Sequence, residues 1–170
     1  NQTKAATISI SNHHGPVYLR FGRPKVPNFT DPNQDFKIGK GVKLIDGDDV
    51  TIVATGHLVW EAIEACNQLK KEGISAELIN IHTIKPLDEK IILKSIVKTK
   101  CIVSAEEHNI IGGLGESISS VLVRNNLVPM EFVGVEDSFG ESGTPTQLMN
   151  KYGLSSEKIM EKCKKVILRK

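Results

Sequence analysis

The chain has 170 residues, of which 39% are hydrophobic and 25% are charged, as is typical of a folded globular protein. A length of this order accommodates one domain, or one domain with a fragment of another. The formal net charge of +2 at pH 7 is close to neutral, which argues against nucleic acid or a membrane surface as a partner. The apolar runs are also too short to span a bilayer.

The three cysteines, Cys66, Cys101 and Cys163, are far apart in the sequence and lie among apolar residues. This pattern predicts reduced thiols in the core of a cytoplasmic protein, with redox or metal chemistry as the alternative. The chain begins at Asn1 without an initiating methionine, and no signal peptide follows. We therefore expect a section of a longer protein.

The N-terminal part of the chain is expected to belong to a separate folding unit. Residues 3–12 predict the end of a helix, and Val17–Leu19 with Phe21 predict a strand. Residues 24–36 contain three prolines together with asparagines and aspartates, a composition that predicts a linker. We accordingly divide the chain into a remnant of one unit at residues 1–23, a linker at 24–36 and a domain at 37–170.

Beyond the linker, short apolar runs alternate with segments whose apolar residues recur at helical spacing. Strands are expected at residues 42–45, 50–54, 74–81, 101–104 and 130–135, and helices at 58–69, 88–97, 116–123, 144–150 and 155–168. This alternation predicts an α/β fold, a three-layer sandwich with helices on both faces of a mostly parallel five-stranded sheet. Asp88 and Ser155 are the expected N-caps of two helices.

The first two of these strands are joined only by the turn Gly47-Asp48-Asp49. A connection of this length fits a hairpin and is too short for a parallel crossover. We therefore expect these two strands to pair with each other, which makes one edge strand of the sheet antiparallel.

The segment after the strand at 101–104 is the most informative part of the sequence. It continues with Glu106, Glu107 and His108, and a glycine cluster then precedes the next helix. In open α/β sheets, ligands and partners bind outside the carboxyl ends of the strands. Acid–base chemistry is one interpretation of these side chains, and a solvated or interface role is the one we prefer. His82 and the loop 137–143 also follow strands and would extend this polar edge.

Gly112, Gly113 and Gly115 open the helix that follows. One interpretation is a phosphate cradle, because backbone N–H groups at a helix N-terminus attract anions. The spacing differs from the dinucleotide-binding fingerprint, and the segment does not follow the first βα strand of the domain. We prefer the interpretation that the glycines allow positive φ angles and close packing of the helix on the sheet.

Arg20 and Arg23 flank Phe21-Gly22 at the end of the first expected strand. A guanidinium group at a strand end is a common ligand for phosphate, because its planar fork matches the phosphate oxygens. A surface ion pair is an equally good interpretation of the residues alone. The sequence contains no P-loop, no paired-cysteine metal site and no Gly-x-Ser-x-Gly nucleophile turn.

Taken in order, these segments resemble the C-terminal part of the transketolases, thiamine-diphosphate enzymes of sugar phosphate metabolism. The matching segments are Gly15–Arg23, which resembles the last strand of the pyrimidine-binding domain, Asp49–Gly56, His82–Asp88, Glu106–Gly115 and Phe139–Gly143. The resemblance covers nearly the whole chain and is greatest to transketolases that are split into two subunits. Deoxyxylulose-phosphate synthase, the beta subunits of 2-oxoacid dehydrogenases and a non-catalytic assembly module stay open as alternatives.

The resemblance implies transfer of a two-carbon ketol unit between sugar phosphates by a complete enzyme that uses thiamine diphosphate and Mg²⁺ or Ca²⁺. It implies Arg23 as a ligand of the sugar phosphate and Arg20 as a second choice, while Gly22 departs from the serine or alanine of many members. The Gly-Asp-Gly…Asn motif that anchors the diphosphate is not in this sequence. We therefore expect no cofactor site, metal ligand, catalytic residue or activity in this section alone.

The resemblance also implies protein partners. The cofactor would be held by N-terminal domains, either in the same chain or in a separate subunit, and the family's C-terminal domain implies a homodimer. In that dimer we expect the strand-end loop Glu106–Gly115 to lie at the subunit interface. A partner subunit would then supply donors or counter-ions for Glu106, Glu107 and His108.

Overall fold

The computed structural model describes residues 1–22 and 25–170, and its elements follow the predicted alternation. The strands are β1 (Val42–Ile45), β2 (Val50–Ala54), β3 (Ala76–Asn80), β4 (Ile102–Asn109) and β5 (Met130–Val135). The helices are α1 (Gln2–Ser11), α2 (Leu58–Lys71), α3 (Glu89–Thr99), α4 (Leu114–Asn125), α5 (Pro145–Lys151) and α6 (Ser156–Ile167). β4 is longer than expected, so that Glu106, Glu107 and His108 lie on a strand and not in a loop.

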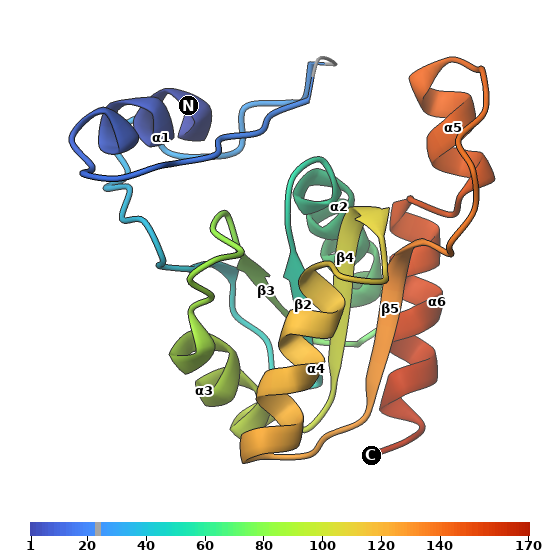
Figure 1. The fold of residues 1–170 in the computed structure, drawn as a ribbon. Helices are drawn as coiled ribbons and strands as arrows, with labels where there is room; N and C mark the ends of the chain where they lie inside the picture. Colours follow the sequence, from blue (N-terminus) through green and yellow to red (C-terminus); the bar gives the residue numbers. More distant parts are fainter. Residues whose placement is uncertain (23–24) are drawn as a thin grey trace.

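The strands form one sheet in the order β1-β3-β2-β4-β5, in which only β1 is antiparallel to its neighbour (Figure 1). The predicted mostly parallel sheet with one antiparallel edge strand is confirmed. The predicted hairpin between the first two strands is wrong, because β1 pairs with β3 and not with β2.

The turn between β1 and β2 explains this difference. It crosses the start of β3, where the N–H groups of Asp48 and Asp49 donate to the carbonyl oxygen of Ser75 at 3.0 and 2.8 Å. The backbone approaches so closely that a Cβ atom on Gly47 would lie 2.5 Å from the carbonyl oxygen of Ala76. The turn is therefore tied to β3, and β1 continues on the far side of β3 from β2.

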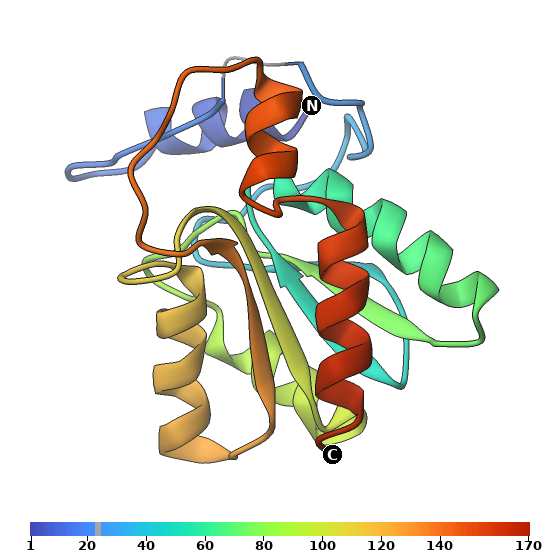
Figure 2. The same ribbon diagram turned by 90° about the vertical axis from the view of Figure 1, so that its right-hand side faces the viewer.

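Helices cover both faces of the sheet, as the predicted three layers require. α2 and α6 pack on one face, and α3 and α4 pack on the other (Figures 1 and 2). Successive residues of β2 serve the two cores, since Ile52 packs with α2 and α6 and Val53 packs with α3 and α4. The three cysteines are free and buried, and all lie in the core on the α2 and α6 side.

The two expected helix caps behave differently. Ser155 precedes α6 and its hydroxyl oxygen accepts from the N–H of Lys158 at 3.4 Å, as predicted. Asp88 stands at the N-cap position of α3, but its carboxylate makes no capping bond. It accepts instead from the N–H of Gly41 at 3.1 Å and so holds the approach to β1.

The N-terminal segment lies over the carboxyl ends of the parallel strands, as the upper part of Figure 1 shows. α1 confirms the predicted helix, but the strand predicted at Val17–Leu19 and Phe21 is wrong, because these residues form no strand. A strand requires a neighbour for its hydrogen bonds, and the described residues offer none here. The boundaries that we assign to the linker stay a prediction.

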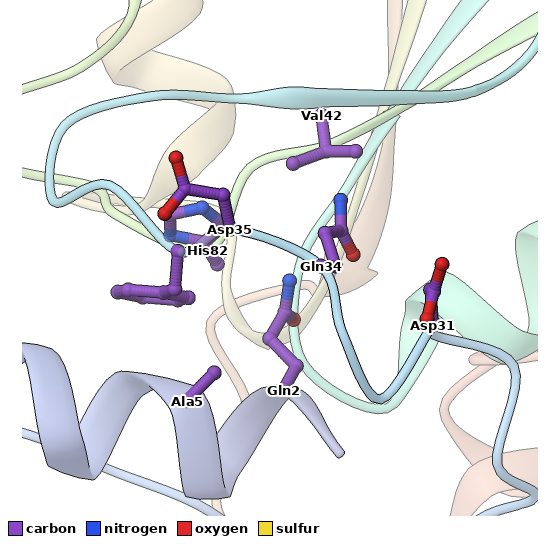
Figure 3. A pocket seen from close by; sticks show the side chains of 8 residues that line it. Gln2, Ala5, Asp31, Gln34, Asp35, Val42 and His82 are labelled. Carbon is purple, nitrogen blue, oxygen red and sulfur yellow. The ribbon is translucent and has the colours of Figure 1, made fainter.

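α1 is held on the domain through residues of β3 and the segment before β1. The side-chain amide of Asn80 donates to Gln2 Oε1 at 3.1 Å, and the ring of Phe36 lies 4.1 Å from that of His82. Figure 3 shows Gln2 and Ala5 of α1 facing His82 and Gln34 across a cavity of about 10 Å³. A cavity of this size has room for roughly one water molecule, so the packing is close. Along the described residues, no helix is long and apolar enough to cross a membrane.

Candidate functional site

The candidate site is the edge of the sheet at which the parallel strands end. β2 leads through Gly56, whose φ of +59° favours glycine, into His57 at the start of α2. The neighbouring strand β4 brings Glu106, Glu107 and His108 to the same edge. The N-terminal segment passes over this edge and contributes Arg20 and Gly22.

Glu106 is directed inward and fills the N-terminus of α4. The residue is only 2% exposed, and its two carboxylate oxygens accept from the N–H groups of Leu114 and Gly115 at 2.8 Å each. In the turn before the helix, the N–H group of Gly112 donates to Glu116 Oε2 at 2.8 Å. The positive end of the α4 dipole is therefore neutralised by carboxylates of this chain.

This arrangement excludes the phosphate cradle and explains the glycines. Gly112 has a φ of +76°, and a Cβ atom on Gly113 would lie 2.7 Å from the carboxylate carbon of Glu106. A Cβ atom on Gly115 would lie 2.7 Å from the ring of Phe132. Each glycine thus provides a left-handed turn or a close approach. The donors that we expected Glu106 to receive from a partner subunit come from its own chain.

Glu107 contacts a residue, His57, that the sequence analysis missed. His57 Nδ1 lies 3.0 Å from Glu107 Oε2, and both side chains are less than one-fifth exposed, at 19% and 18%. Glu107 therefore also finds within the chain a contact that we expected from a partner subunit. The available signal was the position of His57, three residues after the buried strand β2, at the edge where β4 also ends.

His57 and His108 each contact the N-terminal segment. The guanidinium group of Arg20 lies in hydrogen-bond contact with His108 Nε2, across 88 positions of the sequence. The backbone of Gly22 approaches the ring of His57 so closely that a Cβ atom there would lie 2.7 Å from Cε1. Arg20 and His108, which the sequence analysis assigns to two separate candidate sites, are therefore in direct contact in the structure. Arg23, the other predicted phosphate ligand, lies outside the described residues.

The other polar strand ends have separate environments. His82 stacks on Phe36, and burial lowers the pKa of its imidazole, although a hydrogen bond with its own backbone acts in the opposite direction. In the loop after β5, Phe139 is 96% exposed while its carbonyl oxygen accepts from the hydroxyl of Tyr152 at 2.9 Å. The side-chain amide of Asn109 donates to Asp137 Oδ1 at 3.1 Å and so links this loop to the end of β4, next to His108.

The polar residues at this edge form hydrogen bonds and close contacts with one another and with the backbone: Arg20, His57, Glu106, Glu107 and His108. Across the described ranges 1–22 and 25–170, no three His, Cys, Asp or Glu side chains gather in an arrangement that could hold a metal ion. The α4 N-terminus, which follows the glycine cluster at this edge, is filled by Glu106. These residues do not fit a diphosphate and its metal ion, and we assign them no step of cofactor chemistry.

Comparison with known proteins gives a consistent picture. Residues 39–159 match the family described as "Transketolase, C-terminal domain". The 6-deoxy-6-sulfo-D-fructose transketolase subunit SqwH of Clostridium sp. (strain MSTE9) is 43% identical over 99% of this chain and 52% of its own length. A "putative transketolase C-terminal section" of Methanocaldococcus jannaschii is 42% identical over 96% of this chain and 53% of its own length.

Among solved structures, the protein described as "Split gene transketolase, inactive beta4 tetramer" superimposes with a TM-score of 0.95 at 40% identity. The alignment covers 98% of this chain and 55% of that one. The present chain thus spans about half the length of the curated relatives that it matches, 52% and 53%. The N-terminal segment before residue 39, which the family match leaves out, is included in these longer alignments.

Proposed function

The chain belongs to the transketolase C-terminal domain family, and on this premise we propose that it is the C-terminal section of a transketolase. The observation that carries the proposal is the similarity to the split-gene transketolase, which extends over 98% of the chain at 40% identity. In the complete enzyme, an N-terminal section would add the missing domains, and the assembly would transfer a two-carbon ketol unit between sugar phosphates.

In this proposal, the chain acts as a scaffold and does not anchor the cofactor. Thiamine diphosphate with its divalent metal ion would supply the carbanion chemistry when bound to the complete enzyme. The Gly-Asp-Gly…Asn motif is not in the sequence, and the α4 N-terminus is filled by Glu106. Calorimetric titration of the chain alone with thiamine diphosphate and Mg²⁺ should give no binding heat, and a micromolar dissociation constant would contradict this division of labour.

Reconstitution tests the function itself. The chain and the N-terminal section from the same source are mixed with thiamine diphosphate and Mg²⁺, and transfer from a ketose phosphate to an aldose phosphate is followed. We expect activity from the mixture and none from either component alone. Use of a 2-oxoacid donor in place of the ketose phosphate would assign the chain to the synthase or dehydrogenase relatives. Stable complexes without any transfer would support a non-catalytic assembly module.

We assign the phosphate of the sugar substrate to Arg23, with Arg20 as a second ligand. The exposure of Arg20 at the carboxyl edge of the sheet supports this assignment. Loss of a charge-assisted contact costs about 1.5–3 kcal/mol, so Arg23→Ala should raise the KM for a phosphorylated substrate roughly 10- to 100-fold. An unphosphorylated substrate should be affected far less, and equal losses for both would make Arg23 a structural residue.

The proposed complex contains two copies of this chain, with the turn before α4 at the subunit interface. Two exposed apolar side chains support a protein partner at this edge, Ile111 at 59% and Phe139 at 96% exposure. Ile111→Asp should lower the dimer content measured by light scattering. Val97→Asp is the matched control, because Val97 is 68% exposed but lies on α3. Equal dimer content in both variants would place the interface elsewhere.

A further inference from the structure

Two consecutive residues of β4 are connected to the N-terminal segment near Arg20 and Gly22. His108 contacts Arg20 directly, and Glu107 reaches Gly22 through His57. We infer that His57, Glu107 and His108 are positioning residues for the arginine-bearing segment that binds the substrate phosphate. This inference rests on the proposed function and adds to it residues from the C-terminal domain, which would otherwise act only as a scaffold.

The first connection runs from Glu107 through His57 to Gly22. The 3.0 Å contact between His57 Nδ1 and Glu107 Oε2 fixes the orientation of the imidazole ring. The opposite side of that ring faces Gly22, where a Cβ atom would lie 2.7 Å from Cε1. The ring therefore supports the backbone that immediately precedes Arg23 in the sequence. The side chains of His57 and Glu107 are both less than one-fifth exposed, so water competes little with their contact.

The second connection runs from His108 to Arg20. A guanidinium group can only donate hydrogen bonds, so Nε2 of His108 accepts in this contact. His108 lies beyond the last residue of β4 that pairs with β2, Ala105, and immediately before Asn109, which pairs with Val135 of β5. Because the next residue is held in the sheet, the contact with His108 restricts where the Arg20 side chain can lie. Arg20 and Gly22 thus each contact a histidine at this edge: Arg20 contacts His108 of β4, and Gly22 contacts His57, which is held in turn by Glu107 of β4.

This geometry predicts an effect on substrate affinity and not on the chemical step. We infer that these three side chains act only through the segment that carries Arg20, so their removal should leave kcat nearly unchanged. A displaced guanidinium ligand weakens phosphate binding, because charge-assisted contacts depend on alignment. The expected signature is a raised KM for phosphorylated substrates only.

Steady-state kinetics of the reconstituted enzyme test this signature. His57→Ala and Glu107→Ala should each raise the KM for a ketose phosphate about 3- to 30-fold, as for the loss of one coupled contact, with kcat within about twofold. Glu107→Gln keeps an acceptor for His57 Nδ1 and should restore most of the affinity. Glu136→Ala, at an exposed glutamate just after β5, is the matched control and should behave as wild type.

A double-mutant cycle separates positioning from general damage. Gly22→Ala introduces a Cβ atom against the His57 ring and should raise KM in the wild-type background. In the His57→Ala background that obstruction is gone, so the same change should add little. Strictly additive effects of the two substitutions would overturn the inferred contact between positions 22 and 57.

Limited proteolysis gives a readout that does not require activity. Trypsin cleavage after Arg20 should accelerate at least threefold in His108→Ala, since the arginine is released from its contact, while cleavage after Lys37 should not change. An inactive wild-type complex would refute the proposed function, and the inference would then be decided by this rate alone. Unchanged cleavage after Arg20 would overturn the inference. If the wild-type complex is active, the inference would also be overturned by His57→Ala and Glu107→Ala variants that lose kcat or keep the wild-type KM.

Discussion

Glu106 lies directly beneath Gly113, so that a Cβ atom on the glycine would come within 2.7 Å of the carboxylate carbon. The carboxylate cannot withdraw easily, because the N–H groups of Leu114 and Gly115 hold it at 2.8 Å. A glycine turn that resembles an anion-binding site is therefore a site already filled by the chain itself.

Gly113→Ala should destabilise the fold by about 2–3 kcal/mol, because the added methyl group must displace a buried carboxylate or the start of α4. Urea unfolding followed by circular dichroism measures the difference. Gly140→Ala is the matched control, since a Cβ atom at that position meets no atom within 4 Å. Similar midpoints for the two variants would show that the turn before α4 relaxes without cost.

Glu106→Gln should lower the free energy of unfolding by about 1.5–3 kcal/mol, as expected for hydrogen bonds to a charged group. The glutamine side chain has only one oxygen, so its NH₂ group would face one of the two backbone N–H donors, to which it cannot bond. The helix dipole would also lose its counter-charge. Glu116→Gln, at an exposed residue with one backbone contact, should cost less than about 1 kcal/mol. A smaller effect at position 106 than at 116 would contradict the capping role.

Stability should fall as the pH drops below the ordinary histidine value of 6.5, because burial lowers the pKa of His82 in the folded state. Between that value and the lower folded pKa, the unfolded chain binds a proton that the folded chain does not. Thermal melting from pH 8 to 5 should therefore show a steeper decline for wild type than for His82→Phe, which keeps an aromatic ring against Phe36. Parallel pH profiles would mean that His82 titrates alike in both states.

The thiols should be unreactive in the folded protein. Burial raises the pKa of Cys66 to about 12 and raises that of Cys163 well above its ordinary value, so the reactive thiolate is scarce. A colorimetric disulfide reagent at pH 8 should detect no thiol within minutes and all three cysteines after unfolding in guanidinium. Rapid reaction of one equivalent in the native protein would reveal an opening of the core between α2 and α6.

Local patterns in the sequence determined the α/β alternation, the five strands of the sheet and most helix positions. β2, Val50–Ala54, is buried along its whole length, and such a strand appears in the sequence as a continuous apolar run. Ser155 was recognisable as the cap of α6 because its bond reaches only three residues along the chain. These features depend on neighbours in the sequence and therefore leave a signal there.

Only the tertiary structure decided which distant groups satisfy one another. β1 pairs with β3 because the turn after β1 donates hydrogen bonds to the carbonyl oxygen of Ser75, at the start of β3. No pattern within residues 42–49 indicates that contact. In the sequence, Glu106 and His57 are both polar residues that follow a run of buried strand residues. In the structure, Glu106 caps α4, whereas His57 contacts the backbone of Gly22. Such roles depend on which groups the folded backbone brings within hydrogen-bond distance, and the contact of Arg20 with His108 across 88 positions exists only once the sheet has formed.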